Sequence, residues 1–384
     1  MRRVALLLLT LLPAAALQAA EIASAEQLGQ MLFFDVNLSK NRTQSCATCH
    51  DPGRAFTDSR DNGVGGAVSL GDNGRSLGDR NAPTAAYASF SPPFHRGADG
   101  KFRGGQFHDG RAATLAEQAG GPPLNPAEMA MPDKAAVVER LRENPIYVDA
   151  FERLHGAGIL TDDERAYAAM AASIAAFEQT DLFAPFDSRY DRFLRGELEL
   201  TPEEELGRTL FFSGQFTNCN LCHQLNPLPG TAGEAFASYE FHNIGVPANH
   251  AIRARNGMGP EAVDHGLLAN PAVTDPAQDG RFKVPTLRNV AVTSPYMHNG
   301  VFRDLRTVIL FYNKYNSRSA RRQINPETGV AWDAPEVAGT LSLEELETGP
   351  ALDDRRIDAL VAFLRTLTDR RYEHLLERSA TEPE

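Results

Sequence analysis

The sequence predicts a mainly α-helical protein built from two similar halves in tandem, with long loops between its helices. The first observation is a repeat: L-G-x-x-L-F-F occurs at residues 28–34 and 206–212, and its apolar positions have helical spacing. The second is that C-x-x-C-H follows each copy, at residues 46–50 and 219–223. The third is that no apolar/polar alternation longer than a short ribbon occurs. A duplicated unit of helix and loop explains all three.

Each C-x-x-C-H is the attachment signature of a c-type haem, and each pentapeptide ends in a histidine, His50 or His223, that can supply an axial nitrogen to iron. The two motifs use all 4 cysteines of the chain, which are Cys46, Cys49, Cys219 and Cys222. The predicted fold is therefore mainly α, with two cytochrome c-like haem domains in tandem and long loops. The expected cofactors are two covalently bound haem c groups.

Three other uses of the cysteines explain the sequence less well. A zinc site with four thiolate ligands also needs two C-x-x-C pairs, but it needs no histidine after each pair. A thioredoxin-like redox pair expects a βαβ context, which the sequence does not show. A disulfide within each pair would leave both histidines unexplained.

The first twenty residues have the features of a secretory signal peptide. Arg2 and Arg3 form a basic start, residues 5–12 are apolar, and small residues follow. Cleavage after Ala20 or within residues 23–25 is expected, and an uncleaved anchor is the alternative. The apolar run is too short for an ordinary membrane span, so we expect none in the mature protein. Because bacteria attach c-type haem outside the cytoplasm, the expected location is the periplasm.

The chain is acidic, with a formal net charge of −12 at pH 7. Removing the first twenty residues takes away two arginines and no acids, so the mature protein is more acidic still. An acidic surface argues against nucleic acid, whose phosphates bind to basic surfaces. It can steer a basic redox partner, although solubility alone explains it equally.

Two helical stretches are expected between the haem motifs, near residues 134–155 and 162–181. The second is rich in alanine and places Met170, Ile174 and Phe177 on one face. A polar stretch containing proline follows and marks the boundary between the halves. The predicted division is a signal peptide at 1–20, an N-terminal cytochrome c-like haem domain at 21–185 and a C-terminal cytochrome c-like haem domain at 186–384.

The second half has clear helix starts. Thr201 as N-cap, Pro202 in the first turn and Glu204 form a capping box before the second repeat. Ser342 with Glu345 predicts another capping box. Further helices are expected at 305–315 and near 353–367. Long segments rich in Gly, Pro and Asn are expected to wrap the haems, and they lie at 51–83, 91–106, 225–285 and 316–340.

Five further segments carry specific motifs. They are R-N-A-P-T at 80–84, F-H-D-G-R-A at 107–112, E-Q at 117–118 leading to L-N-P-A-E-M at 124–129, V-P-T-L-R-N at 284–289 and S-P-Y-M-H-N-G at 294–300. In this order they resemble the bacterial di-haem cytochrome c peroxidase/MauG family, over nearly all of the mature chain. The resemblance implies that hydrogen peroxide reacts at the N-terminal haem.

The resemblance also implies that a Gln and a Glu ten residues apart line the distal side of that haem, and these are Gln118 and Glu128. Heterolysis of peroxide needs a base for the first proton and an acid for the departing oxygen. A carboxylate near iron can do both, and an amide can orient the peroxide. The alternative is that both are ordinary solvated residues. Met129 and Met131 are expected to fill the core.

Peroxidase members of the family carry a distal His between the first haem and R-N-A-P-T. This chain has no histidine between His50 and His95, and His95 falls within an insertion-like stretch at 90–107. His95 is a weak candidate ligand. The N-terminal iron is therefore expected to be open in its ferric state, which resembles the MauG-type branch.

The second axial ligand of the C-terminal haem separates the two branches. Peroxidase members use a Met fourteen residues after the His of P-Y-x-H, and counting from His298 gives Tyr312, as in the Tyr-ligated MauG-type branch. A phenolate is a hard anionic donor that lowers the potential of iron, whereas a thioether favours ferrous iron. The alternative is Met297 as ligand with Tyr312 as a buried helical residue. His298 is not expected to bind iron.

The resemblance further implies a calcium ion between the haems, bound by the side chain of Asn81 and the carbonyls of Thr293 and Pro295. Oxygen donors suit calcium. The family motif has a Trp between the haems where this chain has His108, which is harder to oxidise but titratable. We include His108 with the candidate catalytic residues.

Two further positions bear on the route of oxidation. In the MauG enzyme that builds a quinone cofactor, a surface Trp relays oxidation to the protein substrate. The matching position is Thr217, which puts that substrate in doubt. The one tryptophan of the chain, Trp332, is expected to pack in the interior.

The expected function is a periplasmic di-haem oxidoreductase that reacts with hydrogen peroxide and oxidises a partner protein or an electron donor. One alternative is a cytochrome c peroxidase that reduces peroxide with electrons from a small cytochrome or cupredoxin. Another is a non-catalytic electron-transfer cytochrome with two six-coordinate irons. The identity of the partner and the oligomeric state stay open.

Overall fold

The computed structural model describes residues 22–226 and 228–378, so the predicted signal peptide lies outside the described residues. The described chain is rich in helix and has few strands. The helices of the first half are α1 (Ala25–Phe34), α2 (Cys46–Cys49), α3 (Leu115–Ala119), α4 (Lys134–Arg142), α5 (Pro145–His155) and α6 (Asp163–Glu178). In the described ranges, no helix is both long and apolar enough to cross a membrane.

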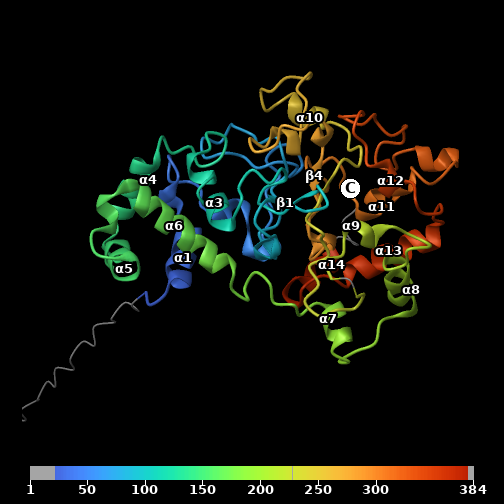
Figure 1. Ribbon diagram of the computed structural model, residues 1–384, viewed down its shortest axis with the longest axis horizontal. Coiled ribbons are helices and arrows are strands. Elements are labelled where there is room, and N and C mark those ends of the chain that lie inside the picture. Colours follow the sequence, from blue (N-terminus) through green and yellow to red (C-terminus); the bar gives the residue numbers. More distant parts are fainter. Residues whose placement is uncertain (1–21, 227, 379–384) are drawn as a thin grey trace, which may run out of the picture.

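The second half lies beside the first, with ribbons and loops between them (Figure 1). Its helices are α7 (Arg189–Leu194), α8 (Pro202–Phe211), α9 (Cys219–Cys222), α10 (His250–Arg253), α11 (Leu305–Asn313), α12 (Leu343–Leu346), α13 (Asp354–Arg365) and α14 (Glu373–Arg378). Thr201 caps α8 in a capping box with Glu204, which confirms that predicted start.

The strands are short antiparallel ribbons, as predicted. β1 (His95–Arg96) pairs with β2 (Phe102–Arg103), and β3 (Phe241–His242) pairs with β4 (Phe282–Lys283). A bridge between Arg103 and Glu240 connects the two ribbons, so the first half contacts the second here. The two ribbons and the bridge therefore hold part of the long loop 91–106 against part of the long loop 225–285.

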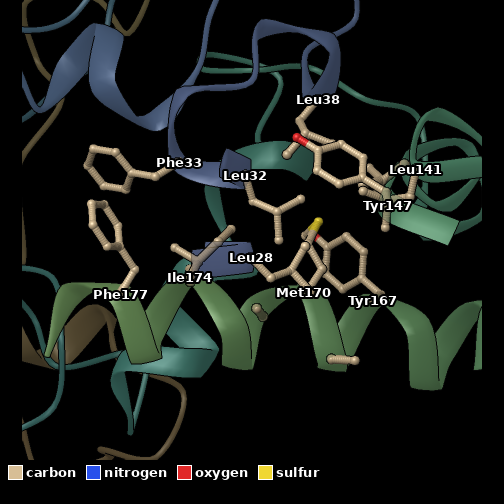
Figure 2. Packing of buried hydrophobic residues seen from close by; sticks show 14 of the residues in the cluster. Leu28, Leu32, Phe33, Leu38, Leu141, Tyr147, Tyr167, Met170, Ile174 and Phe177 are labelled. Atoms are coloured by element: carbon tan, nitrogen blue, oxygen red, sulfur yellow. The ribbon is translucent and has the colours of Figure 1, made fainter. Parts of the chain in front are cut away.

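The core of the first half forms where α1 crosses α6 (Figure 2). The predicted apolar face of α6 is confirmed, because its side chains meet those of α1 in one buried cluster. The residues that meet there include Leu28, Leu32, Phe33, Met170, Ile174 and Phe177. Met129 and Met131 belong to the same cluster, which confirms that they fill the core.

The second half has an equivalent core between α8 and α13. The glycine of each L-G-x-x-L-F-F repeat explains why the pairs of helices correspond. A Cβ on Gly29 would overlap the carbonyl oxygen of Ser173 in α6, and a Cβ on Gly207 would overlap that of Ala359 in α13. Both glycines therefore let the repeat helix approach the backbone of its partner closely.

Replacing Gly207 with Ala is expected to destabilise the holoprotein by about 1–3 kcal/mol, because the added methyl forces α8 away from α13. Chemical unfolding followed by circular dichroism measures this change. Gly214→Ala is the matched control, because a Cβ at Gly214 meets no atom within 4 Å. Equal unfolding midpoints for the two variants would contradict the close-approach explanation.

Two predictions of local structure were wrong. The stretch 134–155 is two helices, because Pro145 lacks an N–H and starts a new helix whose N-cap, Asn144, accepts from Ile146. Ser342 precedes α12 but forms no side-chain cap with Glu345. Its hydroxyl accepts instead from the backbone N–H of Asn243 at 3.3 Å, so a long-range contact replaced the local one.

Candidate active site

The cysteine pair of each C-x-x-C-H motif forms one short helical turn, α2 or α9, which follows the repeat helix of its half after a loop. Burial raises the pKa of the Cys49 thiol, and of the Cys219 thiol, to about 11. Among the described residues, no three His, Cys, Asp or Glu side chains converge to hold a metal ion. The two cysteine pairs are therefore separate sites and not the four ligands of one zinc.

The histidine of each motif is oriented in the same way. His50 Nδ1 lies 3.1 Å from the carbonyl oxygen of Phe56, and His223 Nδ1 lies 3.2 Å from that of Phe236. A carbonyl can only accept, so Nδ1 carries the proton in both rings. The lone pair of Nε2 is left for iron, which is the arrangement that haem ligation requires.

The two residues that provide these carbonyls, Phe56 and Phe236, have the same backbone conformation. Phe56 and Phe236 have positive φ values of 55° and 56°. The residue before each is held by a threonine: Thr84 Oγ1 donates to Ala55 at 2.6 Å, and Thr286 Oγ1 donates to Ala235 at 2.7 Å. The sequence analysis missed these hydrogen bonds. The dipeptides A-F and P-T that form them occur in both halves, but the number of residues that separates them from the C-x-x-C-H motif differs between the halves.

A cavity of about 350 Å³ lies beside the second motif. Its walls are mostly apolar and include Cys219, Cys222, His223 and Tyr312. Two thiols, an imidazole with a free Nε2 and an apolar enclosure are what a c-type haem needs, so the residues present fit this cofactor.

Tyr312 and Met297, the two alternative ligands, both line this cavity. Burial and then the nearby Cys222 and Cys219 raise the pKa of Tyr312 above its usual range, which places its hydroxyl near the attachment thiols. Met297 packs instead with the cluster of Val246, Phe302 and Phe311.

The first motif has acidic neighbours. Burial is the main cause that raises the pKa of Cys46 and of Cys49, and the Glu128 carboxylate adds to it in both cases. The charge of Glu128 is thus felt at both thiols. Gln118 lies in α3, whose N-cap is Thr114, and is half-buried.

His108 and the three predicted calcium ligands line the same cavity as Tyr312. His108 Nε2 lies 3.0 Å from the carbonyl oxygen of Asn81. Burial and then Arg80 lower the pKa of His108 to about 4, so this imidazole is neutral at pH 7. Thr293 and Pro295 approach the cavity from the second half.

Other predicted residues lie away from the motif histidines. His95 is exposed on β1, and its ring contacts the carbonyl of Pro93. Trp332 packs edge-on against Phe302 and Phe311, as expected for a packing residue. Thr217 is buried, and its hydroxyl donates to the carbonyl of Leu210.

Three buried titratable residues were not anticipated. Burial raises the pKa of Glu178 to about 8, and its charge acts on Cys46. His242 lies 3.5 Å from Glu240 and 3.7 Å from Glu345, beside the second motif. Burial lowers the pKa of Lys283 to about 7. Sequence patterns did not reveal them, because each is buried by segments distant in the chain.

Comparison with known proteins gives a family. A family model described as di-haem cytochrome c peroxidase matches residues 23–199. The methylamine utilization protein MauG of Paracoccus denitrificans is 60% identical over 352 residues, which cover 92% of this chain and 90% of that protein. The chain belongs to the di-haem cytochrome c peroxidase family. The cytochrome c peroxidase Ccp of Escherichia coli is 32% identical over 88% of this chain and 57% of its own length.

Solved structures of di-haem peroxidases have the same fold. The diheme peroxidase BthA of Burkholderia thailandensis superposes with a TM-score of 0.79 and 34% identity, covering 91% of this chain and 86% of that chain. A MauG-like protein associated with microbial copper homeostasis gives 0.66 and 31%, covering 91% of each chain. This di-haem peroxidase is an oxidoreductase with two c-type haems, which confirms the family resemblance seen in the sequence.

Proposed function

We propose that this di-haem peroxidase is of the MauG type: hydrogen peroxide reacts at the haem of the first motif, and a partner protein or electron donor is oxidised through the haem of the second. The observation that carries this proposal is the position of Tyr312 beside Cys219, Cys222 and His223. A tyrosine ligand stabilises oxidised iron, whereas a thioether ligand stabilises reduced iron, which can deliver electrons.

The two halves are cytochrome c-like haem domains in tandem, with the boundary near residues 185–186. The matching helix pairs and the identical supports of His50 and His223 argue for this division. His50 and His223 would each bind the iron of the haem attached at their own motif. When bound, each haem supplies the iron redox chemistry that cleavage of an oxygen–oxygen bond requires.

Glu128 transfers the protons of peroxide. Its carboxylate accepts a proton from one oxygen of the hydrogen peroxide at the first site. It then gives this proton to the other oxygen of the peroxide, which leaves as water. Burial raises the pKa of Glu128, with Arg111 and Asn125 acting in the opposite direction, and a raised pKa makes the carboxylate a better proton acceptor. Gln118 orients the peroxide through its amide.

Tyr312, together with His223, would hold the iron of a haem attached at the second motif. Burial raises the pKa of its phenol, and binding to a metal would release the phenol proton, as it does for other ionisable ligands. We assign a calcium ion to Asn81, Thr293 and Pro295 on the cavity wall, with His108 beside Asn81.

The chain is exported by residues 1–20 and acts in the periplasm. Its partners are hydrogen peroxide and a periplasmic redox protein or protein substrate. A second candidate is an electron-fed cytochrome c peroxidase, which the relatives of that name at about one-third identity favour.

The ferric holoprotein is expected to react rapidly with hydrogen peroxide when no reductant is present. The reason is that the first iron has no distal histidine to block it. Stopped-flow absorption of the fully ferric protein measures the loss of its spectrum. A reaction that requires prior reduction of one haem would contradict the MauG-type proposal and support the electron-fed peroxidase.

A Tyr312→Met variant tests the proposed iron ligand, and it is expected to shift the midpoint potential of one haem to a more positive value.

A further inference from the structure

Lys283 is a buried cation that no role described so far uses. It is the last residue of β4 and lines the cavity of the second motif. Its ammonium donates to the carbonyl of Gly105 and to Ser91 Oγ, which are neutral oxygens. Among the described residues, no carboxylate forms an ion pair with it. An enclosed ammonium without an anion is costly, because neutral acceptors replace only part of its hydration.

The nearby carboxylates are already paired. Asp109 acts on Lys283 at longer range, but it binds Arg80 at 2.7 Å and Arg111 at 2.9 Å. Arg80 also binds Asp264 at 2.6 Å. Three cations therefore share two carboxylates, and the positive charge left over is that of Lys283.

The cavity itself offers no other partner. Of the described residues that line it, Glu345 is the one carboxylate, and it lies 3.7 Å from His242. Burial lowers the pKa of Lys283 to about 7, so an anion is what would keep its ammonium fully charged at neutral pH, and this anion must come from outside the polypeptide.

The position of Lys283 matches one chemical source of such an anion. The cavity extends from the attachment thiols Cys219 and Cys222 to a region lined by Ser91, Gln106 and His108 of the first half. A haem carries its thioether bonds on two pyrroles and its two propionate carboxylates on the other two. A haem attached at the thiols therefore presents carboxylates to a part of the cavity remote from them.

We propose that Lys283 binds a propionate of the haem attached at Cys219 and Cys222. This ion pair ties the edge of the second haem to the first half of the protein, since the same ammonium donates to Gly105 and Ser91. The proposal rests on haem attachment at the second motif and not on reaction with peroxide, so either can fail without the other.

Lys283→Gln in the full-length holoprotein tests the proposal by redox titration and resonance Raman spectroscopy. A positive charge beside a haem stabilises its reduced form. The variant is therefore expected to shift the midpoint potential of one haem to a more negative value and to displace its propionate bending band. Lys283→Arg is expected to keep the potential near that of the wild type. Lys134→Gln is the control, because Lys134 pairs with Glu164 on the surface of the first half.

Three outcomes would overturn the proposal. The first is that Lys283→Gln and Lys134→Gln leave the potentials and the Raman band equally unchanged. The second is that Lys283→Arg shifts the potential as much as Lys283→Gln, which indicates a structural role for the loop contacts. The third is that chloride or phosphate changes the wild-type potential and this response is lost in Lys283→Gln, which identifies a free anion as the partner. If Lys283→Gln does not accumulate as holoprotein, Lys283→Arg carries the test, with a displaced propionate band and unchanged potentials expected.

Discussion

Replacing Glu128 with Gln is expected to slow the reaction of the ferric protein with hydrogen peroxide by about 10²–10⁴-fold, the usual contribution of a positioned acid–base group. The amide is similar in size to the carboxylate, but it cannot accept a proton from peroxide and return it. Attachment of both haems is expected to be unaffected, because Cys46 and Cys49 remain. Stopped-flow absorption under excess peroxide gives the second-order rate constant for both proteins.

The pH dependence of this rate provides a second test. Burial raises the pKa of Glu128. A base must be deprotonated to act, so the wild-type rate is expected to fall with decreasing pH, beginning above the ordinary titration range of glutamate. Glu128→Gln is expected to lack this limb. A variant that retains it would contradict the assignment of Glu128 as the base.

Two other glutamates test whether the effect is specific to Glu128: Glu117 is a control, and Glu178 is the competing candidate. Glu117 lies in the first turn of α3, and its carboxylate accepts from the N–H of Ala113 at 2.7 Å, so Glu117→Gln is expected to leave the rate unchanged. Glu178 is the other carboxylate whose charge acts on Cys46. A larger loss in Glu178→Gln than in Glu128→Gln would transfer the proton-transfer role to Glu178.

Replacing Arg288 with Met is expected to lower the free energy of unfolding by about 3–5 kcal/mol, because it leaves the carboxylate of Asp191 buried without a cation, with only Ser188 of the described residues still donating to it. The side chains of Arg288 and Asp191 are 0% and 4% exposed. The two guanidinium NH₂ groups of Arg288 donate to the two carboxylate oxygens at 2.6 and 2.9 Å, and its Nε donates to the carbonyl of Glu234 at 2.9 Å.

The environment of Arg288 shows why this loss is large. Its guanidinium lies over the rings of Tyr87, Phe186 and Phe236, so water cannot easily replace the arginine. Phe236 also provides the carbonyl that orients His223. Removal of Arg288 is therefore expected to loosen the second haem site as well as the fold.

Urea unfolding of the holoprotein measures the effect of Arg288→Met. Arg306→Met is the control, because Arg306 pairs with Asp354 and Asp358 at the surface and its loss is expected to cost less than about 1 kcal/mol. Adding Asp191→Leu to Arg288→Met is expected to recover part of the lost stability, since it removes the unpaired charge. Equal effects of Arg288→Met and Arg306→Met would refute this account.

The sequence by itself determined the features that depend on residues close together in the chain. The repeat helices, the two haem loops, the capping box at Thr201 and the apolar face of α6 follow from local spacing, and the structure confirms them. The two wrong predictions of local structure, the helical stretch at 134–155 and the capping box at Ser342, have different causes. Pro145 was a sufficient signal for a helix break, whereas nothing near Ser342 indicated its contact with Asn243.

The tertiary structure alone decided the environment of the candidate site. The carbonyls that orient His50 and His223 lie six and thirteen residues further along the chain, so unequal loops hid a common arrangement. The charge left on Lys283 emerges only when Asp109 is seen to be bound by two arginines. The physical reason is that burial and pairing depend on which distant segments fold together, and these in turn set the energy of a charge or the state of a proton.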